Sequence, residues 1–566
     1  MLIYEHLYVL IRFGGFYFLK INICMKNKLS LFKQNWKAGL TVSLVSIPLS
    51  LALAIASGAT PTQGMITALW AGLFAAIFGG SNFNIVGPTG ALSGILIGYT
   101  LVHGYVGLPL IAMIAGIMII IAYLLRLDRY IIFIPGSVVH GFTLGVAFII
   151  GLGQINNLFG LHNMPKAEGP INGIVLALEK FSEIQWPVFA LFVIGVAFIF
   201  YWNKKVKKIP GAVVLAFIGI ALSMYLAEHP VSFLNLETLG QKYDIKAQFF
   251  LNTWKNFSWD ILYNREIWVI SFATMIIAIL ETLMSGQIAD NMTKTKFNRK
   301  KEVLGLGIAN IASGLTGGIP ATAALARTAL NVKSGATHKS SALMSGVFLF
   351  VISFALLGYF KALPMVIIAS ILVYVAIAMV EMEHFIHLLD NEKTAFWLSI
   401  TVAIVTIAED PIIGLLFGSV VALIIFVQNI SQGKTEILIF KNGKMMSSIM
   451  RNDVNGQEID SDMIVYKISG TLTYINMPAH LKIARKIKGN KYVILSLRHA
   501  FYVDTDGINY LKEIIEILKN QNEKIILTGI NPEIKHRIEK EEFYKTKLVE
   551  HKIYDRTSEA INELYK

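Results

Sequence analysis

The sequence predicts an α-helical polytopic membrane protein with a small cytoplasmic α/β domain at its C-terminal end, and three observations support this fold class. The 566 residues are 55% hydrophobic and only 15% charged, which is too apolar for a soluble globular protein. Apolar runs long enough to cross a bilayer recur from about residue 37 to residue 428. Residues 435–566 contain no such run. We therefore divide the chain into a lead-in over 1–36, a transmembrane transport domain over 37–430 and a cytoplasmic domain over 435–566.

The lead-in contains the chain's one cysteine, Cys24, which excludes an internal disulfide and a cysteine-based metal cluster. Charged residues interrupt the aromatic stretch over 1–24, and the stretch lacks a convincing signal-peptide cleavage site. We predict that translation begins at Met25, and that the polar residues after it form a cytoplasmic approach to the first span.

The membrane domain contains two sets of seven apolar segments. The predicted spans are 37–57, 63–80, 86–102, 107–125, 130–156, 184–202 and 210–226, followed by 267–287, 302–316, 322–333, 341–359, 362–380, 394–408 and 411–429. The third member of each set is a poor span, because glycine and proline interrupt it. A pair of such segments at corresponding positions indicates a transporter built from two inverted repeats.

Short basic clusters set the predicted orientation. Most of the net charge of +13 lies at 126–129, 203–208, 294–301 and in the tail after 433. Each of the first three clusters abuts an apolar run, as the positive-inside rule expects of cytoplasmic loops. A nucleic-acid-binding protein would more often gather its charge on one soluble face. We therefore expect no nucleic-acid partner, an inner (plasma) membrane location, and both termini in the cytoplasm.

The two weak spans predict an anion site. The sequences "IVGPTGALSG" (85–94) and "PATA" (320–323) would break their helices at membrane depth, where irregular backbone survives only if protein buries it or water lines it. Two half-helices that begin there direct free backbone N–H groups and positive dipole ends at one place. Thr89 and Thr322 can add hydroxyl donors. The alternative is a kink, or a close helix crossing through small residues, but the matched positions favour a site.

Two ionisable residues inside spans are further candidates. Glu281 lies in the middle of a predicted span, where a carboxylate is costly and is by default a functional candidate, and Ser285 follows one turn later on the same face. Arg327 lies in the second weak span and could add a positive charge to the anion site. The alternatives are a hydrogen-bonded structural acid and a snorkelling arginine. His140 and His338 lie beside helix breaks, and we interpret both as structural.

The chain resembles the SulP family of inorganic anion transporters. The resemblance rests on "GLTVSLVSIPLSLALAIASG" (39–58), "NIVGPTGALSG" (84–94), the block over 285–336 and the cytoplasmic tail. It implies fourteen spans as two inverted seven-span repeats. It also implies a core domain, formed by spans one to four and eight to eleven, that moves against a gate domain within a homodimer.

The resemblance also implies the site residues. It places the anion between the starts of spans three and ten, here Thr89, Gly90 and Ala91 facing Ala324, Leu325, Ala326 and Arg327. Glu281 occupies the coupling position of span eight. Ser50 stands near the position at which sulfate-type members carry a glutamine.

The choice of substrate and coupling ion depends on departures from the family patterns. The stretches "PLSLALA" and "GPTGA" are similar to bicarbonate-type members, whose sodium site needs an aspartate and hydroxyls in spans eight and ten. This chain has the longer Glu281 with Ser285, and Leu325 supplies no hydroxyl. Glu281 and Arg327 together are more similar to proton-coupled sulfate carriers.

The tail predicts a sheet covered by helices. The runs "MIVYKISGTL", "KYVILSLRH" and "KIILTGI" are strand-like, and helical patterns lie between them. This tail resembles the STAS domain, which in anti-sigma-factor antagonists carries a phosphorylated serine in an Asp-Ser-Ser-Gly turn. Here the turn is "DTDG" (504–507) with Asp506 at that position, and we interpret Thr505 as the N-cap of the next helix.

These observations predict a secondary active transporter for sulfate or a similar oxyanion, coupled to protons and working by an elevator-like alternating-access mechanism. The alternative is a sodium-coupled bicarbonate symporter, and a third interpretation is a membrane-tethered STAS regulatory protein. We expect the anion, a proton or sodium ion, the lipid bilayer and a second copy of the chain as partners. No catalytic constellation, cofactor motif or metal-ligand cluster stands out in the sequence, so we do not expect an enzyme.

Overall fold

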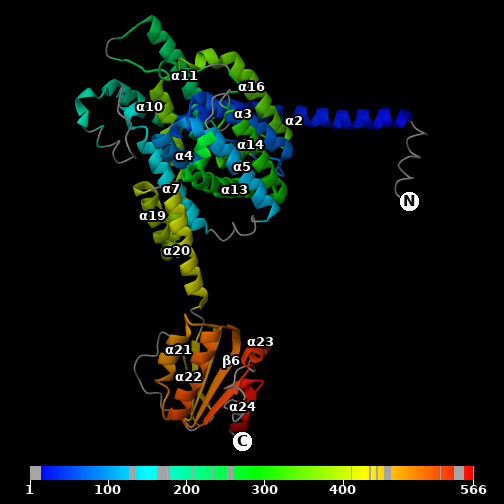
Figure 1. The fold of residues 1–566 in the computed structure, drawn as a ribbon, viewed down its shortest axis with the longest axis vertical. Helices are drawn as coiled ribbons and strands as arrows, with labels where there is room; N and C mark the ends of the chain where they lie inside the picture. Colours follow the sequence, from blue (N-terminus) through cyan, green and yellow to red (C-terminus); the bar gives the residue numbers. More distant parts are fainter. Residues whose placement is uncertain are drawn as a thin grey trace. The chain divides into compact units, whose positions relative to one another are not determined.

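The chain forms two compact units that divide between Ser419 and Val420 in this computed structural model (Figure 1). The structure describes residues 14–126, 135–161, 175, 177, 179–206, 209–231, 234–245, 248–251, 254, 259–409, 411–431, 435–441, 444–450, 461–522, 524–538, 540 and 553–564. The predicted boundary near residue 430 is close to this division, which falls inside the last helix of the membrane unit. Of the basic clusters, residues 127–129 and 207–208 lie outside the described residues, as do residues 1–13.

Among the described residues, the regular structure of the first unit is helical apart from two very short strands. The helices of its first half are α2 (Gly14–Ala56), α3 (Pro61–Phe78), α4 (Gly90–His103), α5 (Leu108–Leu124), α7 (Gly136–Leu152), α10 (Trp186–Lys205) and α11 (Gly211–Glu228). Those of its second half are α13 (Arg265–Thr293), α14 (Arg299–Leu315), α15 (Leu325–Lys333), α16 (Ser340–Phe360), α17 (Met365–Met379), α19 (Lys393–Ala408) and α20 (Pro411–Ser431). Each predicted span corresponds to one of these described helices, so the predicted polytopic fold is confirmed.

Shorter helices join the long ones. They are α8 (Ile155–Leu158), α12 (Leu239–Lys242), α18 (Met382–Asn391) and the 3₁₀ turns over Tyr105–Gly107, Phe181–Glu183 and Trp259–Tyr263. Local sequence explains several helix starts: Thr60 and Gln63 form a capping box at α3, and the Asn264 side chain accepts a bond from Glu266 N at α13.

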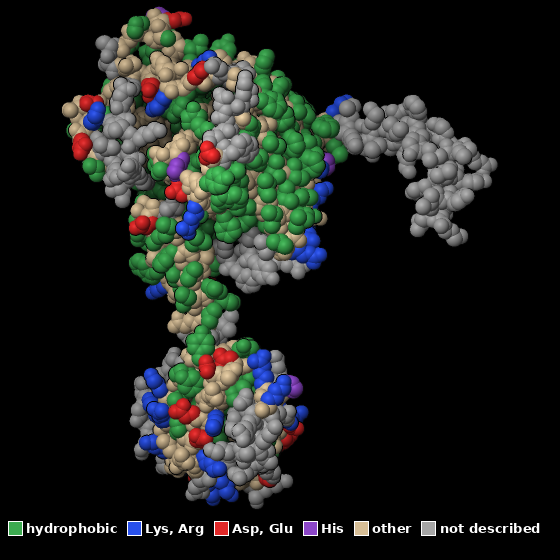
Figure 2. Space-filling view, viewed as in Figure 1, with side chains coloured by type: hydrophobic (Ala, Val, Ile, Leu, Met, Phe, Trp, Pro, Cys, Tyr) green, Lys and Arg blue, Asp and Glu red, His purple; other side chains and the backbone are tan. Residues whose placement is uncertain are grey.

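An apolar exterior suits this unit to lipid. Among the described residues, eight helices are long and apolar enough to cross a membrane on their own. Figure 2 shows hydrophobic side chains over much of the visible surface of this unit. Large apolar side chains such as Ile194, Phe354 and Ile404 are exposed on it. Such a surface is costly in water and favourable in a bilayer.

Helices from the two halves pack against one another. In the part expected to form the core domain, α2 packs on α16, and α14 packs on both α3 and α5. In the part expected to form the gate domain, α7 packs on α19 and α10 packs on α17. The two halves are therefore intertwined, as two inverted repeats require.

The second unit is built on a six-stranded sheet in the order β4-β3-β5-β6-β7-β8. The strands are β3 (Thr435–Lys441), β4 (Lys444–Met450), β5 (Met463–Leu472), β6 (Tyr492–Val503), β7 (Lys524–Thr528) and β8 (Ile553–Tyr554). The helices are α21 (Met477–Ala484), α22 (Thr505–Gln521), α23 (Pro532–Ile538) and α24 (Thr557–Leu564). Strands β5 to β8 are parallel, and β3 pairs antiparallel with β4 and β5.

The predicted α/β tail is confirmed, with two corrections. The three predicted strands are β5, β6 and β7, but the sequence did not reveal the β3–β4 hairpin or β8. The N-cap of α22 is Asp504, whose carboxylate accepts a bond from Gly507 N at 2.6 Å, and Thr505 is the first helical residue. The interpretation of Thr505 as the cap was wrong, because the aspartate ahead of it is an equally good capping residue.

Candidate anion-binding site

Two short strands join the weak spans of the two halves. Strand β1 (Val86–Gly87) pairs antiparallel with β2 (Thr322–Ala323), so that Val86 lies opposite Ala323 and Gly87 lies opposite Thr322. Helix α4 follows β1 and helix α15 follows β2. Because the strands run in opposite directions, the two helices begin at opposite ends of this pairing.

Both half-helices begin without a side-chain cap. Thr89 precedes α4 and Ala324 precedes α15, and neither side chain makes a capping hydrogen bond. The first intrahelical bonds are Ser93 N to Thr89 O at 3.1 Å and Thr328 N to Ala324 O at 2.9 Å. The N–H groups of both first turns therefore lack an intrahelical acceptor, and both helix dipoles present their positive ends. This arrangement favours an anion.

Glu281 on α13 lies at the start of α4. The Thr89 hydroxyl donates a hydrogen bond to Glu281 Oε2 at 2.9 Å, across 192 residues of sequence. Thr89 is buried, whereas the Glu281 side chain is partly buried. The structure thus brings together one predicted anion-binding residue and the predicted coupling residue.

Arg327 lies behind the start of α4. Its side chain is 1% exposed, and its Nη2 donates a hydrogen bond to the backbone oxygen of Pro88. Its Nε and Nη1 have no hydrogen-bond partner among the described residues. A Cβ at Gly87 would lie 2.6 Å from Nη1, so only glycine leaves room for the guanidinium there. The arginine is therefore buried inside the protein and does not snorkel to its surface.

The two walls of the site differ in exposure. Gly90 and Ala91 on α4 are buried, whereas Ala324 and Leu325 are partly exposed and Ala326 is exposed. Two gate helices cover the α4 wall: a Cβ at Gly90 would lie 2.5 Å from Met379 Sδ on α17 and 3.4 Å from Ile150 Cδ1 on α7. Sequence reasoning missed Met379 and Ile150, because an apolar residue in an apolar span does not stand out.

Three other predicted residues lie in supporting positions. The Ser285 hydroxyl donates to Thr328 Oγ1 at 2.8 Å, so it serves α15 rather than Glu281. The Thr322 hydroxyl donates to Ala278 O at 3.0 Å, which uses the proton that it was expected to offer to an anion. Ser50 is fully buried, and its Oγ has no partner among the described residues.

Helix α14 holds the segments that lead into both strands. Glu302 is 4% exposed, and its Oε2 accepts bonds from Gly80 N at 2.6 Å and Ser81 N at 2.7 Å. Two turns later, Asn310 exchanges two hydrogen bonds with the backbone of Ala321, each 2.9 Å long. Sequence reasoning missed both residues. A carboxylate at the edge of a predicted span, beside a lysine cluster, was the one available signal.

The partners of His140 and His338 are not among the predicted site residues. His140 stacks on His384 with ring centroids 3.8 Å apart, and its Nδ1 lies 3.5 Å from Glu381 Oε2. His338 Nδ1 accepts a hydrogen bond from Ser340 N at 3.2 Å, which stabilises the start of α16. Within the described ranges, no three His, Cys, Asp or Glu side chains are grouped as a metal site would require.

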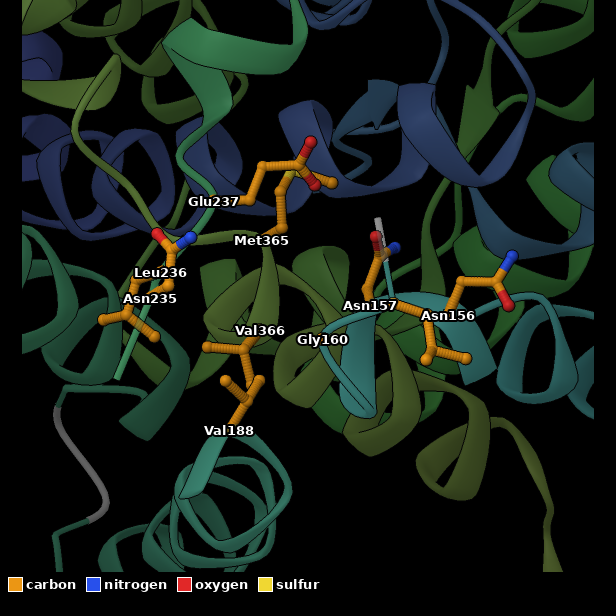
Figure 3. A pocket seen from close by; sticks show the side chains of 10 residues that line it. Asn156, Asn157, Gly160, Val188, Asn235, Leu236, Glu237, Met365 and Val366 are labelled. Atoms are coloured by element: carbon orange, nitrogen blue, oxygen red, sulfur yellow. The ribbon is translucent and has the colours of Figure 1, made fainter. Parts of the chain in front are cut away.

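A separate small cavity lies between α8, α10, α17 and the segment over 235–237 (Figure 3). Lys242 Nζ donates to Asn157 Oδ1 at 3.2 Å and to Glu237 Oε2 at 3.3 Å beside it. The cavity measures about 10 Å³, which is room for at most a water molecule. The predicted site residues do not line it.

The chain matches two family descriptions. Residues 32–403 match the sulfate permease family, and residues 455–560 match the STAS domain. It is 30% identical over 528 residues to the "Putative sulfate transporter YvdB" of Bacillus subtilis, covering 91% of this chain and 96% of that protein. It is 27% identical over 412 residues to the "Bicarbonate transporter BicA" of Picosynechococcus sp., covering 70% of each chain.

Solved structures share the fold. The overall structure of SLC26A9 superposes with a TM-score of 0.76 at 13% identity, over 94% of this chain and 89% of that one. The transmembrane domain of a cyanobacterial BicA superposes with a TM-score of 0.58 at 23% identity, over 69% of this chain and 97% of that one. Because the family match covers more than half of its length, this chain belongs to the sulfate permease family of multi-pass membrane transporters and carries a C-terminal STAS domain.

Proposed function

We propose that the protein is a secondary active transporter that takes up sulfate, or a similar oxyanion, together with protons. One observation carries the proposal: the start of α4 has no side-chain cap, and it lies between a buried arginine and a carboxylate that accepts a hydrogen bond from Thr89, the residue before the helix. The putative sulfate transporter from Bacillus subtilis, at 30% identity over nearly its whole length, supports sulfate as the substrate. We propose the inner membrane, cytoplasmic termini and a homodimer as its setting.

The proposed anion site consists of the first turns of α4 and α15, which contain Thr89, Gly90 and Ala91 and, opposite them, Ala324, Leu325 and Ala326. Backbone N–H groups bind the oxyanion, and the small side chains allow it to approach them. Arg327 supplies a positive charge close to the site, and its low exposure limits screening of that charge by water.

Coupling follows from the position of Glu281. Its carboxylate accepts a bond from Thr89, so a negative charge lies next to the place where the oxyanion must bind. An oxyanion and a charged carboxylate repel each other there, and a proton on Glu281 removes the repulsion. Each ligand therefore promotes binding of the other, which is the thermodynamic requirement for symport.

The movement that we propose is an elevator-like displacement of the core helices against the gate helices. Met379 and Ile150 belong to the gate and contact Gly90 in this conformation. Displacement of α4 along the gate would separate these contacts and open the site to one side of the membrane. The fold shared with SLC26A9 and BicA supports this division into two sets of helices.

Sodium-coupled bicarbonate uptake is the second candidate, because BicA is 27% identical over 70% of the chain. In that case Glu281 would bind the cation. Ser285 is a poor second ligand, since its hydroxyl is directed to Thr328. The third interpretation, a tethered regulator whose output is the STAS domain, has no specific observation in its favour.

The experiment is uptake into proteoliposomes that contain the purified full-length protein. Labelled sulfate and labelled bicarbonate are offered separately, with proton and sodium gradients imposed one at a time, and protein-free liposomes serve as the control. We expect an inward proton gradient to drive sulfate accumulation and sodium to have no effect. Bicarbonate uptake that requires sodium would replace the proposal with its alternative, and uptake of neither anion would refute both.

A further inference from the structure

Two consecutive residues of α13 hold the two walls of the anion site. Glu281 accepts the bond from Thr89 and thereby contacts the α4 wall. Thr282 is fully buried, and its Oγ1 lies 2.8 Å from Thr322 Oγ1 and 3.1 Å from Ala323 N, both on β2. Strand β2 leads directly into α15, so Thr282 contacts the other wall.

The Thr322 hydroxyl determines the direction of the hydrogen bond between Thr322 and Thr282. The Thr322 hydroxyl has a single proton, which it donates to Ala278 O at 3.0 Å. Thr322 must therefore accept from Thr282, and the Thr282 oxygen in turn accepts from Ala323 N. With its proton committed to Thr322, Thr282 has none to donate to an anion.

The backbone of the same residue connects to the α4 side. Thr282 O accepts a bond from Asn84 Nδ2 at 3.2 Å, and the same nitrogen donates to Glu302 Oε1 at 2.7 Å. Asn84 stands two residues ahead of β1. One residue of α13 thus sets the position of both strands relative to Glu281.

We propose that Thr282 is a positioning residue that fixes β2 and the start of α15 to α13, so that the proton on Glu281 acts on the α4 wall while the α15 wall keeps its place. This inference rests on the proposed function. Loss of the Thr282 hydroxyl would leave the buried Ala323 N–H without this acceptor, and such a group is costly. Strand β2 would shift, carrying the first-turn amides of α15 and Arg327 away from the anion.

The test compares three variants of the full-length protein. Thr282→Val keeps the shape of the side chain and removes the hydroxyl, whereas Thr282→Ser keeps the hydroxyl. The matched control is Thr274→Val, two turns earlier on α13: Thr274 is equally buried, and its hydroxyl has no partner among the described residues. Sulfate KM, maximal rate and accumulation driven by a pH gradient are measured in proteoliposomes, and sulfate Kd is measured by calorimetry in detergent.

We expect Thr282→Val to raise the sulfate KM and Kd about tenfold, the size of effect that follows from one unsatisfied buried group. Accumulation at saturating sulfate should stay unchanged, because Glu281 and Thr89 are intact. Thr282→Ser and Thr274→Val should stay within about twofold of the wild type.

The inference would be overturned by an unchanged KM and Kd in Thr282→Val, by a failure of Thr282→Ser to keep the wild-type values, or by an equal loss in Thr274→Val. Loss of accumulation by Thr282→Val at saturating sulfate would also contradict it, since the residue would then act in coupling. A wild-type protein that neither binds nor carries sulfate would refute the proposed function itself, so the two failures are distinguishable.

Discussion

Two glycines at the anion site should respond very differently to the same added methyl group. In Gly87→Ala the new Cβ would lie 2.6 Å from Arg327 Nη1, and in Gly90→Ala it would lie 2.5 Å from Met379 Sδ. Both contacts are too close, so in each variant the neighbouring side chain must move. The effects on sulfate affinity should differ because the Met379 side chain can move aside and the Arg327 side chain cannot.

Arg327 cannot move without damage to the site. It is 1% exposed and its Nη2 is bonded to Pro88 O, directly after Gly87. Forcing an extra methyl group into such packing costs about 1–3 kcal/mol. The variant avoids this cost by displacing the guanidinium, which weakens its attraction for the anion. A loss of that size lowers sulfate affinity roughly 5- to 150-fold, at about 1.4 kcal/mol per factor of ten.

Met379 lies on another helix and its side chain is partly exposed. The atom that the new methyl group would meet, Sδ, is near the flexible end of that side chain. Thioether side chains adapt readily to a changed neighbour, so sulfate affinity in Gly90→Ala should fall by less than about fivefold. Calorimetry with sulfate gives the Kd of both purified variants, and thermal unfolding shows that each remains folded. If folded Gly87→Ala binds sulfate like the wild type, or if Gly90→Ala loses as much affinity, the position of Arg327 behind α4 is wrong.

Three further predictions follow. Glu281→Gln imitates the protonated carboxyl, so the variant should bind sulfate and exchange it across the membrane but fail to accumulate it in a pH gradient. Accumulation of sulfate by this variant would show that another residue couples transport to protons. A cysteine at exposed Lys296, with the native cysteine replaced by serine, should react only with reagents added to the cytoplasmic side, and labelling from the other side would overturn the orientation inferred from charge. In the C-terminal unit, Lys467 Nζ donates a hydrogen bond to Glu436 Oε2 at 2.9 Å, and this bond lowers the pKa of Glu436. The stabilisation that it contributes is therefore fully present above the ordinary pKa of a glutamate. It is lost as the pH falls through the lowered pKa. Glu436→Gln should therefore speed hydrogen exchange in β3 at neutral pH and differ little from the wild type in strong acid; an equal difference at both pH values would contradict this.

The membrane fold could be read from the sequence because bilayers impose long apolar runs and allow irregular backbone only in protected places. For the same reason the weak spans at 86–102 and 322–333 marked the places where the helices are interrupted, although the sequence did not predict that two short strands pair there. Contacts between neutral residues could not be read in this way. Thr282 is one hydroxyl among many in the chain, and its role depends on the position of Thr322, which the sequence does not specify.

The supporting side chains explain the remaining differences. Ser285 does follow Glu281 by one turn, but the distance between helices decides that its hydroxyl meets Thr328 instead. In the tail, the sequence did not predict the β3–β4 hairpin, because its two strands, "TEILIFK" and "KMMSSIM", are short and mix polar with apolar residues. Strand β8 has two residues, too few for any periodicity.

The pairing of β1 with β2 also bears on how the protein is made. Arg327 donates a hydrogen bond to Pro88 O across 239 residues of sequence. The first weak span therefore cannot form its final contacts until the second has been synthesised. At about 5–20 residues per second, the ribosome takes roughly 10–50 s to synthesise that interval. During this time the backbone groups of β1 lack their final partners inside an inserted chain. A nascent chain that stops before residue 323 therefore leaves the backbone N–H and C=O groups of β1 without the partners that β2 supplies.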